Sequence, residues 1–447
     1  MNEHDILERV HAHFDAAKAE LAELVAIPSV SADSFDQSTL ERSAHWIADQ
    51  AKELGLEAEV IQLHTAAGLV GRPAVLATRP PQPGKPTVLL YSHHDVQPQG
   101  PEEKWETQPF VATEKGDRLY GRGAADDKAG VVLHLEAIRA ADAGVGIVMF
   151  IEGEEEVGSP TFEDFLHTYQ EKLKADVIVV ADSNNWAVGT PSLTTSLRGV
   201  VSLRVKLSVL DHALHSGAYS GPVLDAVTLA SRLIATLHDD AGDVAVAGLR
   251  SYDNADVDYP EEQFRIDAGV LEGVQLTGTG SLASRLWTKP TISVIGMDVT
   301  PVQVASNTLL PAVTFTLSLR VAPGQDSREA GEILAAYLKE HAPFGAHVET
   351  EITEAGPGYE AVGDTPVTAI AHDALRSAFK AEPVNIGIGG SIPFISVLHE
   401  LFPEADILVT GVEDPDTRAH SENESLHLGD WQKAIGAEAL LLSKLSE

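Results

Sequence analysis

Acidic side chains follow several apolar runs of this sequence, at the point where each run ends. The residues in these positions are Asp95, Glu155, Glu156 and Asp182. The runs that precede them are TVLLYS (87–92), VGIVMFI (145–151) and VIVVA (177–181). Because ligands of open α/β sheets bind at the carboxyl ends of strands, these acids are candidates for one shared site.

Two of the motifs place acids at short, regular spacing. In YSHHDVQP, His93 and Asp95 are two residues apart, so in an extended chain one can bind a metal ion while the other orients it. In GRGAADDKAG, Asp126 and Asp127 begin a helix predicted over 127–141, where the helix dipole favours carboxylates. Taken alone, the first pair is also compatible with a structural role and the second with a helix cap.

The segment IEGEEEVGS crowds four glutamates after an apolar strand, with no Lys or Arg nearby. They are Glu152, Glu154, Glu155 and Glu156. Such crowding raises carboxyl pKa values unless a cation compensates the charge. A solvated loop is the alternative, but the buried strand that leads into this segment favours a cation site.

Five residues together suit two cations that share one bridging carboxylate. They are His93, Asp126, Glu156, Asp182 and His420, although His420 taken alone would pass for a surface histidine. The chain has no cysteine, so any metal site must use nitrogen and oxygen ligands. Two ions about 3.5 to 4 Å apart can polarise a carbonyl and activate a water, and a free carboxylate must then take the water's proton. Glu155 fits that vacancy.

The elements that position these residues indicate an α/β fold. The 447 residues favour two domains, and predicted helices over 5–25 and 38–54 open a βαβ rhythm. Runs that are apolar almost without alternation are typical of strands covered on both faces, so we expect a mostly parallel sheet with helices on both faces. A helix near 365–379 and the run DILVTG (406–411) return to this type.

A second domain is expected from Arg198 onward, because the strands there alternate between apolar and polar residues. The strand 199–209 and the strand 314–321 each have one wet face, and helices are predicted over 222–237 and 328–341. These pieces predict a separate, inserted α+β domain with an antiparallel sheet. The predicted boundaries are 1–198 and 359–447 for the first domain and 199–358 for the inserted domain.

Charge and hydropathy exclude several classes of partner. The 31 basic and 67 acidic residues give a net charge of −36, which repels phosphate backbones and anionic lipid surfaces. We therefore expect neither a nucleic-acid nor a membrane partner, and no apolar run approaches the roughly 18 residues of a membrane span. The first residues lack the basic start and apolar core of a secretory signal, so a cytoplasmic location is expected.

With these residues in hand, the sequence resembles the zinc-dependent family of acetylornithine deacetylase, succinyl-diaminopimelate desuccinylase, glutamate carboxypeptidase and the carnosinase-like dipeptidases. Eight matches occur in the family's order along nearly the whole chain. They are YSHHDVQP, GRGAADDKAG, EGEEEVGS, the Asp of ADSNNW, ALHSG, the Arg of LSLRVAPGQ, GGSIP and AHSENE.

The resemblance implies a role for each residue of the site. His93 and Asp182 would bind one metal ion, Glu156 and His420 the other, and Asp126 would bridge them. Asp95 would orient His93, Glu155 would be the general base, and His94 and Glu154 would take no part. The two ions would be zinc, with manganese or cobalt also acceptable to such ligands.

The resemblance also assigns residues outside the metal site. His215 would reach a neighbouring active site to steady the oxyanion, and Arg320 would grip a substrate carboxylate. Asn307, Gly390 and Ser391 would contact the substrate. The domain 1–198 and 359–447 would be the catalytic domain, and the inserted domain 199–358 would be the family's lid, which would also form a homodimer interface.

The expected function is hydrolysis of dipeptides, because the long segment 239–300 lengthens the lid as in carnosinase-like dipeptidases. Two departures weaken the substrate assignment: Gly387 and Ile388 stand where many relatives have an arginine before GGSIP, and PDTR replaces a glycine-rich approach to AHSENE. An N-acyl amino acid deacylase is the nearest alternative. A binding protein that kept the fold and lost catalysis is a remote one, since neither the ligands nor the base are missing.

Overall fold

The computed structural model describes residues 2–141, 143–361, 363, 365–390 and 393–447, and their contacts divide the chain into two compact units. Unit 1 consists of Met1–Thr194, Ala361–Asn385 and Val397–Glu447, and unit 2 of Thr195–Glu360 and Ile386–Ser396. Contacts thus group Ile386–Ser396 with unit 2, whereas the sequence placed this stretch in the catalytic domain. The domain boundaries drawn from the sequence stay a prediction.

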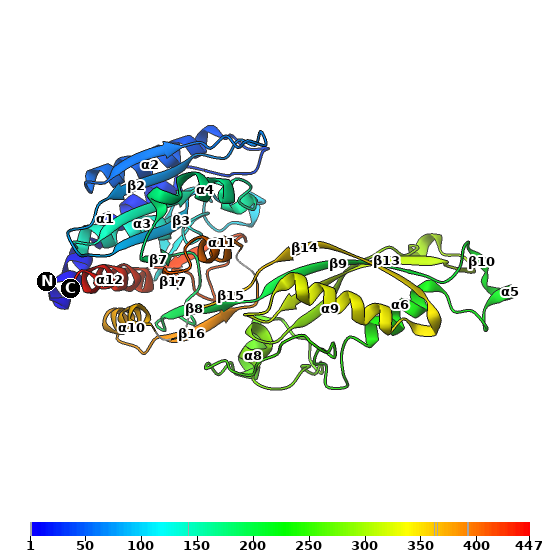
Figure 1. The fold of residues 1–447 in the computed structure, drawn as a ribbon. Helices are drawn as coiled ribbons and strands as arrows, with labels where there is room; N and C mark the ends of the chain where they lie inside the picture. Colours follow the sequence, from blue (N-terminus) through cyan, green and yellow to red (C-terminus); the bar gives the residue numbers. More distant parts are fainter. Residues whose placement is uncertain (1, 142, 362, 364, 391–392) are drawn as a thin grey trace. The chain divides into compact units, whose positions relative to one another are not determined.

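Unit 1 is built on a six-stranded sheet in the order β1-β2-β6-β3-β7-β17 (Figure 1). The strands are β1 (Glu57–Ile61), β2 (Ala74–Arg79), β3 (Thr87–His93), β6 (Gly146–Glu152), β7 (Val177–Val180) and β17 (Asp406–Val409). The last four run parallel, and β1 and β2 are antiparallel additions at one edge. The predicted mostly parallel sheet is confirmed.

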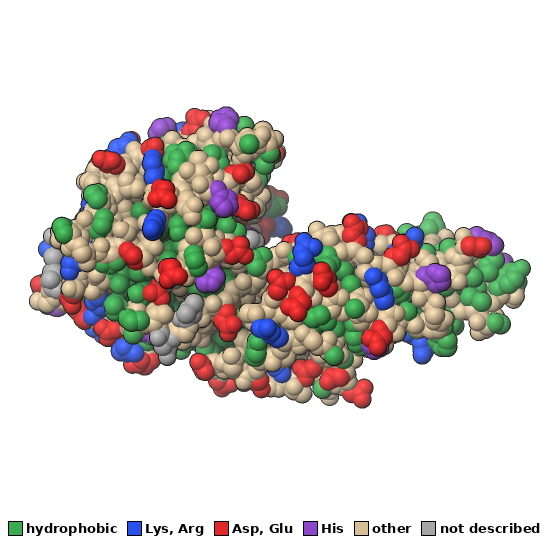
Figure 2. All heavy atoms as spheres, viewed as in Figure 1, with side chains coloured by type: hydrophobic (Ala, Val, Ile, Leu, Met, Phe, Trp, Pro, Cys, Tyr) green, Lys and Arg blue, Asp and Glu red, His purple; other side chains and the backbone are tan. Residues whose placement is uncertain are grey.

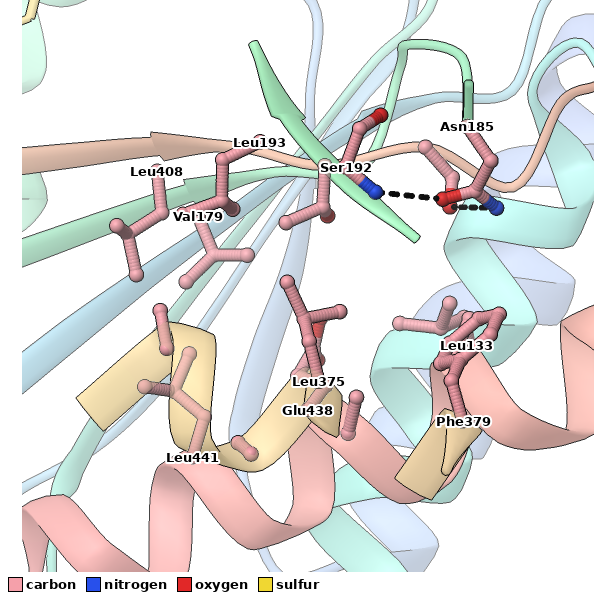
Figure 3. A pocket seen from close by; sticks show the side chains of 16 residues that line it. Leu133, Val179, Asn185, Ser192, Leu193, Leu375, Phe379, Leu408, Glu438 and Leu441 are labelled. Carbon is pink, nitrogen blue, oxygen red and sulfur yellow. Dashed lines mark hydrogen bonds between the residues drawn. The ribbon is translucent and has the colours of Figure 1, made fainter. Parts of the chain in front are cut away.

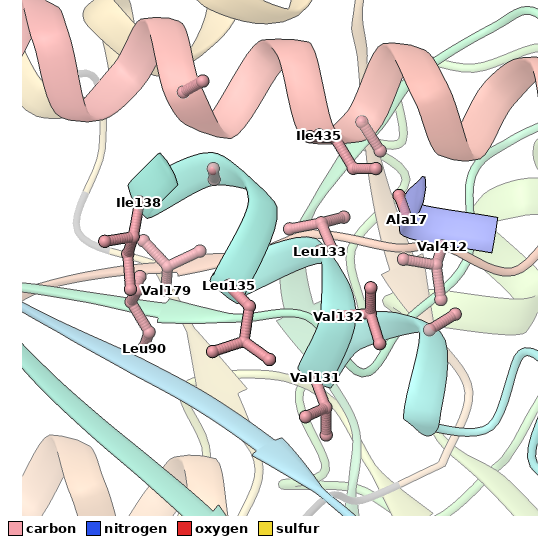
Figure 4. Packing of buried hydrophobic residues seen from close by; sticks show 14 of the residues in the cluster. Ala17, Leu90, Val131, Val132, Leu133, Leu135, Ile138, Val179, Val412 and Ile435 are labelled. Atoms are coloured by element: carbon pink, nitrogen blue, oxygen red, sulfur yellow. The ribbon is translucent and has the colours of Figure 1, made fainter. Parts of the chain in front are cut away.

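Helices cover both faces of this sheet. One apolar cluster joins one face to α1 (Glu3–Val25), α2 (Ser38–Glu53), α3 (Lys128–Ala141), α10 (Pro366–Phe379) and α12 (Leu428–Leu445). In Figure 4, Leu90 and Val179 of the sheet lie beside Leu135 and Ile138 of α3. On the other face, Phe150 stacks on Phe165 of α4 (Phe162–Leu173) with ring centroids 4.6 Å apart.

Unit 2 contains a four-stranded antiparallel sheet in the order β11-β13-β9-β14. The strands are β9 (Gly199–Ser208), β11 (Thr291–Met297), β13 (Ala312–Val321) and β14 (His347–Gly356). Its apolar face packs on α6 (Ala226–Ala235) and α9 (Ser327–Glu340). The predicted antiparallel lid sheet is therefore confirmed. The helix predicted over 222–237 is shorter, because Asp225 caps it by accepting hydrogen bonds from Val227 and Thr228.

The remaining elements are short and connect or flank these sheets. They are β4 (Thr113–Lys115), β5 (Arg118–Tyr120), β8 (Ser192–Leu197), β10 (Leu214–His215), β12 (Thr308–Leu309), β15 (Tyr359–Glu360), β16 (Val384–Ile388), β18 (Ser425–His427), α5 (Ser216–Tyr219), α7 (Glu261–Asp267), α8 (Leu282–Trp287) and α11 (Pro393–Leu401), with 3-10 turns η1 (Glu102–Lys104), η2 (Glu155–Val157), η3 (Val302–Val304) and η4 (Pro343–Gly345).

The surface carries the acidic excess of the sequence. Acidic side chains, drawn in red, are scattered over the face shown in Figure 2. Among the described residues, none of the helices combines the length and the apolar content that a membrane crossing needs.

Candidate metal centre

Three neighbouring parallel strands of unit 1 deliver the acidic residues to one edge of the sheet. His93 is the last residue of β3, and Asp182 follows β7 by two residues. Glu155 and Glu156 form the 3-10 turn η2 that follows β6. Because β6, β3 and β7 are parallel neighbours, their carboxyl ends meet, as the sequence predicted.

His93 lies at the centre of the first group of ligand-capable atoms. Its Nε2 atom is 3.1 Å from Oδ1 of Asp126 and 3.9 Å from Oδ1 of Asp182. These three residues could hold a metal ion, because one ligand atom from each lies within 4.8 Å of the others. The His93 ring is almost fully buried.

His420 belongs to a second such group. Its Nε2 atom is 3.0 Å from Oδ2 of Asp126 and 3.1 Å from Oε2 of Glu156. Asp126 is thus a member of both groups, each through a different oxygen. The structure brings together all five residues that the sequence proposed as metal ligands.

The electrostatics of the cluster suit divalent cations. Burial raises the pKa of Asp182 to about 6 and that of Glu155 to about 7, and neighbouring carboxylates add to both shifts while His93 opposes them. Hydrogen bonds to Asp126 and Glu156 raise the pKa of His420 to about 11. Carboxylates that crowd in a buried site need positive charge, and imidazole nitrogens and carboxylate oxygens are ligands of zinc. The residues present therefore fit two such ions.

Glu155 lies beside the two groups and belongs to neither. One of its carboxylate oxygens is 4.0 Å from Nε2 of His93, and 28% of its side chain is exposed. A carboxylate that lies next to a metal site without binding the metal can exchange a proton with a water molecule at that site. The position is the one that the sequence expected for the base.

Asp95 contacts more than the sequence expected. The Nδ1 atom of His93 lies 3.0 Å from the Asp95 carbonyl oxygen and 3.5 Å from its Oδ1. The Asp95 carboxylate also accepts hydrogen bonds from the backbone amides of Glu155, at 3.2 Å, and Glu156, at 3.1 Å. It therefore fixes the turn that carries Glu155 and Glu156, in addition to its contact with His93.

Gln97 is a residue of the site that the sequence interpretation missed. Its side-chain amide donates to Oε2 of Glu156 at 2.8 Å, and its backbone amide donates to Oε1 at 3.0 Å. Gln97 lies two residues after Asp95 in the same motif, so the two-residue spacing that identified Asp95 could have identified Gln97 as well.

Glu413 is a second missed residue, in the loop after β17. Its backbone amide donates to the carbonyl oxygen of Ser183, which places it beside the loop of Asp182. Burial, together with the charges of Asp126 and Asp182, raises the pKa of Glu413 well above its usual range. Like Asp182, it follows an apolar strand, and the same rule could have found it.

His94 and Glu154, which were expected to take no part, have structural contacts. The Nε2 atom of His94 lies 2.8 Å from the carbonyl oxygen of Pro73. The Glu154 carboxylate accepts hydrogen bonds from the amides of Arg72 and Thr161. Both side chains therefore fix loops next to the site.

The other predicted functional residues lie in unit 2. His215 ends β10, which pairs with β12 immediately after Asn307, and both residues are exposed. Arg320 lies on β13 opposite Thr291, and Gly390 follows β16. Ser391 lies outside the described residues. The roles of these residues toward the substrate stay predictions.

Arg198 is a buried guanidinium of unit 2 that the sequence interpretation did not single out. It donates to the carbonyl oxygens of Gly389, at 2.9 Å, and Lys289, at 3.2 Å. Burial, with a smaller contribution from Arg320, lowers the pKa of Arg198 to about 10. A Cβ atom at Gly389 would lie 2.8 Å from the Arg198 guanidinium and 2.9 Å from the backbone carbonyl oxygen of Leu286, so this close approach favours glycine.

A small cavity of about 30 Å³ lies in the core of unit 1 (Figure 3), and none of the five candidate metal ligands lines it. Leu133, Val179, Leu375, Phe379 and Leu441 are among its mainly apolar lining residues. Its volume is that of a water molecule rather than of a peptide. We interpret it as a packing defect.

Comparison with known proteins places this geometry in context. The model of peptidase family M20/M25/M40 matches residues 89–444. The chain is 35% identical over 434 residues to the cysteinylglycine-S-conjugate dipeptidase of Corynebacterium striatum, covering 95% of this chain and 94% of that protein. It is 26% identical over 474 residues to the Beta-Ala-His dipeptidase of Rattus norvegicus, covering 98% and 95%.

Solved structures share the fold over the full length. Human carnosine dipeptidase 1 superposes with a TM-score of 0.75 at 23% identity, covering 100% of this chain and 99% of that one. The family model and the relative from Corynebacterium striatum both match most of the sequence, and they confirm the resemblance drawn from the motifs. The chain therefore belongs to peptidase family M20/M25/M40.

Proposed function

We propose that this protein is a metal-dependent dipeptidase that hydrolyses the amide bond of dipeptides at a bridged dinuclear site. The observation that carries the proposal is the convergence of two imidazoles and three carboxylates, with Asp126 shared by both groups and Glu155 beside them. When bound, two divalent cations would polarise the scissile carbonyl and activate a water. Zinc is the expected ion.

The chain's own residues supply proton transfer and positioning. Glu155 takes a proton from the attacking water and returns one to the leaving nitrogen. Asp95 holds Glu155 through its backbone amide and contacts the ring of His93. His215 steadies the oxyanion and Arg320 pairs with the substrate's carboxylate. These assignments rest on the motif matches together with the contacts of unit 1.

Dipeptides are the substrate class that we favour. The two relatives compared above are named as dipeptidases of cysteinylglycine S-conjugates and of Beta-Ala-His. A free carboxylate on the substrate is consistent with the cationic pair of Arg198 and Arg320 in unit 2.

The test is a substrate comparison with metal-free and metal-restored protein. Purified enzyme is stripped with a chelator, reconstituted with zinc, manganese or cobalt, and assayed on matched dipeptides and N-acyl amino acids. We expect kcat/KM to be at least ten-fold higher for dipeptides. A preference for the acyl substrates would replace the dipeptidase with a deacylase, and cleavage of neither class by restored protein would indicate a binding protein.

We further propose that unit 2 joins two copies of this chain in a homodimer. Its edge strand β11 and the turn after it expose five apolar side chains. They are Val294, Ile295, Val299, Val302 and Val304. Such exposed apolar groups on an edge strand are typical of an interface. Light scattering should give twice the chain mass, and Ile295→Lys should give monomer; a monomeric wild type would contradict the dimer.

A cytoplasmic location stays a prediction.

A further inference from the structure

One buried carboxylate joins the two loops that carry Asp126 and His420. The first loop precedes α3, and the second is closed by a hydrogen bond from the Ser425 amide to the Thr417 carbonyl oxygen. Glu424 lies in the second loop and is fully buried. Its own carbonyl oxygen accepts a hydrogen bond from the amide of Gly121, at the start of the first loop.

The Glu424 carboxylate is saturated by donors from the first loop. One oxygen accepts from the backbone amides of Ala125, at 3.0 Å, and Asp126, at 3.1 Å. The other accepts from the amide of Gly123, at 3.1 Å, and from the Arg122 guanidinium, at 2.6 Å. All four contacts come from donors, so the group acts as an acceptor only, as an ionised carboxylate does.

Arg122 extends this connection to the residue next to His420. Besides Glu424, its guanidinium donates to the carbonyl oxygen of Ser421 at 3.1 Å and to that of Pro98 at 3.3 Å. Arg122 is itself only 2% exposed. The backbone of Asp126 and the backbone after His420 are thus held by one pair of buried, hydrogen-bonded side chains.

We infer that Glu424 is a positioning residue that sets the placement of the Asp126 carboxylate relative to the His420 imidazole. The inference rests on the proposed dinuclear site, because its consequence is the affinity and geometry of metal binding. Residues that orient metal ligands in this way typically change metal affinity by about 10- to 100-fold when they are altered.

Glutamine cannot replace this glutamate despite its equal size. A carboxamide offers one acceptor oxygen, and its nitrogen would face two donors: either the amides of Ala125 and Asp126, or the amide of Gly123 with the Arg122 guanidinium. At least two of the four hydrogen bonds are lost, because the carboxamide nitrogen is itself a donor and cannot accept from the two donors that face it. Both loops therefore lose their common restraint.

The experiment measures metal binding rather than turnover alone. Zinc affinity is determined by competition with a chromophoric chelator for wild type, Glu424→Gln and the control Glu136→Gln. Glu136 is a buried glutamate whose partners His13 and Arg139 belong to no metal-bearing loop. The visible absorption of the cobalt-substituted proteins reports the ligand geometry.

We expect Glu424→Gln to bind the first or the second ion at least ten-fold more weakly, to show an altered cobalt spectrum, and to lose kcat more than it raises KM. Glu136→Gln should match wild type in affinity and spectrum, even if its melting temperature falls. An unchanged affinity and spectrum in Glu424→Gln would overturn the inference, and so would equal weakening in both variants, since that marks general destabilisation.

If Glu424→Gln does not fold, Arg122→Lys gives the same test. Lysine keeps the positive charge beside Glu424 but cannot reach Ser421 and Pro98 as the guanidinium fork does. It should weaken zinc binding and alter the cobalt spectrum in the same direction, and wild-type values would overturn the inference. A wild-type protein that binds fewer than two ions would contradict the dinuclear site itself, and the role of Glu424 would fall with it.

Discussion

The Nε2 atom of His420 lies 3.0 Å from one carboxylate oxygen of Asp126. The other oxygen of Asp126 lies 3.1 Å from Nε2 of His93. Each oxygen of a single aspartate therefore faces a different imidazole, and each imidazole has its own second carboxylate, Asp182 or Glu156. A carboxylate with this arrangement can serve two cations at once.

Asp126→Asn should therefore lower the bound metal content more than substitution of Asp182 or Glu156, which belong to one group each. We expect Asp126→Asn to retain fewer than one ion per chain after dialysis, because the carboxamide offers one neutral oxygen in place of the two carboxylate oxygens that face the two groups. Asp182→Asn should retain about one, because only one group is affected. Metal content by mass spectrometry checks this, with Asp240→Asn, an exposed aspartate of unit 2, as control. Equal retention in the Asp126 and Asp182 variants would contradict a shared carboxylate.

Glu155→Gln should separate proton transfer from metal binding. We expect kcat to fall by about 10²- to 10⁴-fold with the metal content unchanged, because the base is lost while both ligand groups remain. In wild type, kcat/KM should fall as the pH falls, since the Glu155 carboxyl must be ionised to accept a proton. Burial raises its pKa to about 7, and bound cations favour the ionised form, so the midpoint should lie below 7. A Glu155→Gln variant with near-normal kcat would remove the base assignment.

Local patterns were sufficient to predict much of this molecule. The strands β3, β6 and β7 were recognised because they are apolar almost without interruption, and β9 because it alternates. The acids that follow the parallel strands were candidates for one site, because the carboxyl ends of these strands meet at one edge of the sheet. Both signals are contained in a few consecutive residues.

Contacts between distant segments were not predictable in this way. The amide of Asp126 and the carboxylate of Glu424 are 298 positions apart in the sequence, and nothing in AHSENE indicates which backbone its last glutamate meets. The same holds for Arg198 and Gly389, which are 191 positions apart. Side-chain hydrogen bonds of this kind depend on the completed fold. Glu424 and Arg198 were therefore missed, and Asp95 was expected to contact His93 but not the backbone amides of Glu155 and Glu156.

Arg320→Ala should weaken the binding of substrates that carry a terminal carboxylate more than the binding of substrates that lack it. If Arg320 pairs with the substrate's carboxylate, KM for a dipeptide should rise by about ten-fold or more, as loss of a charge-assisted hydrogen bond predicts. The corresponding dipeptide amide, which lacks that carboxylate, should show little difference between wild type and variant. Equal effects on both substrates would assign Arg320 to the stability of β13 instead.

Arg198→Met should destabilise unit 2 and impair substrate binding together. The change leaves the carbonyl oxygens of Gly389 and Lys289 without their donor, at about 1–3 kcal/mol for each buried group. Since Gly390 follows this segment, KM should rise more than kcat falls. Arg204→Met is the matched control, because Arg204 lies exposed on β9 and pairs with Glu351, which is exposed as well. Thermal unfolding and kinetics that match this control would refute the role.

His134 should make the stability of unit 1 depend on pH. The buried ring lies between the Glu438 carboxylate, at 2.8 Å from Nδ1, and the carbonyl oxygen of Tyr91, at 3.0 Å from Nε2. Burial lowers the pKa of His134, but the charge and hydrogen bond of Glu438 outweigh it, so the pKa in the folded protein is raised. A raised folded-state pKa means that the protonated ring stabilises the fold fully below the unfolded-state pKa of about 6.5, and that this stabilisation disappears as the pH rises through the folded-state value.

The free-energy difference between wild type and His134→Gln, from urea unfolding, should therefore be larger at pH 6 than at pH 9. His4→Gln, at an exposed position of α1, should show no such change. A difference for His134→Gln that stays constant, or that grows toward pH 9, would mean that the ring is neutral in the folded protein. The Glu438 contact would then be an ordinary hydrogen bond that stabilises α3 against α12 at every pH.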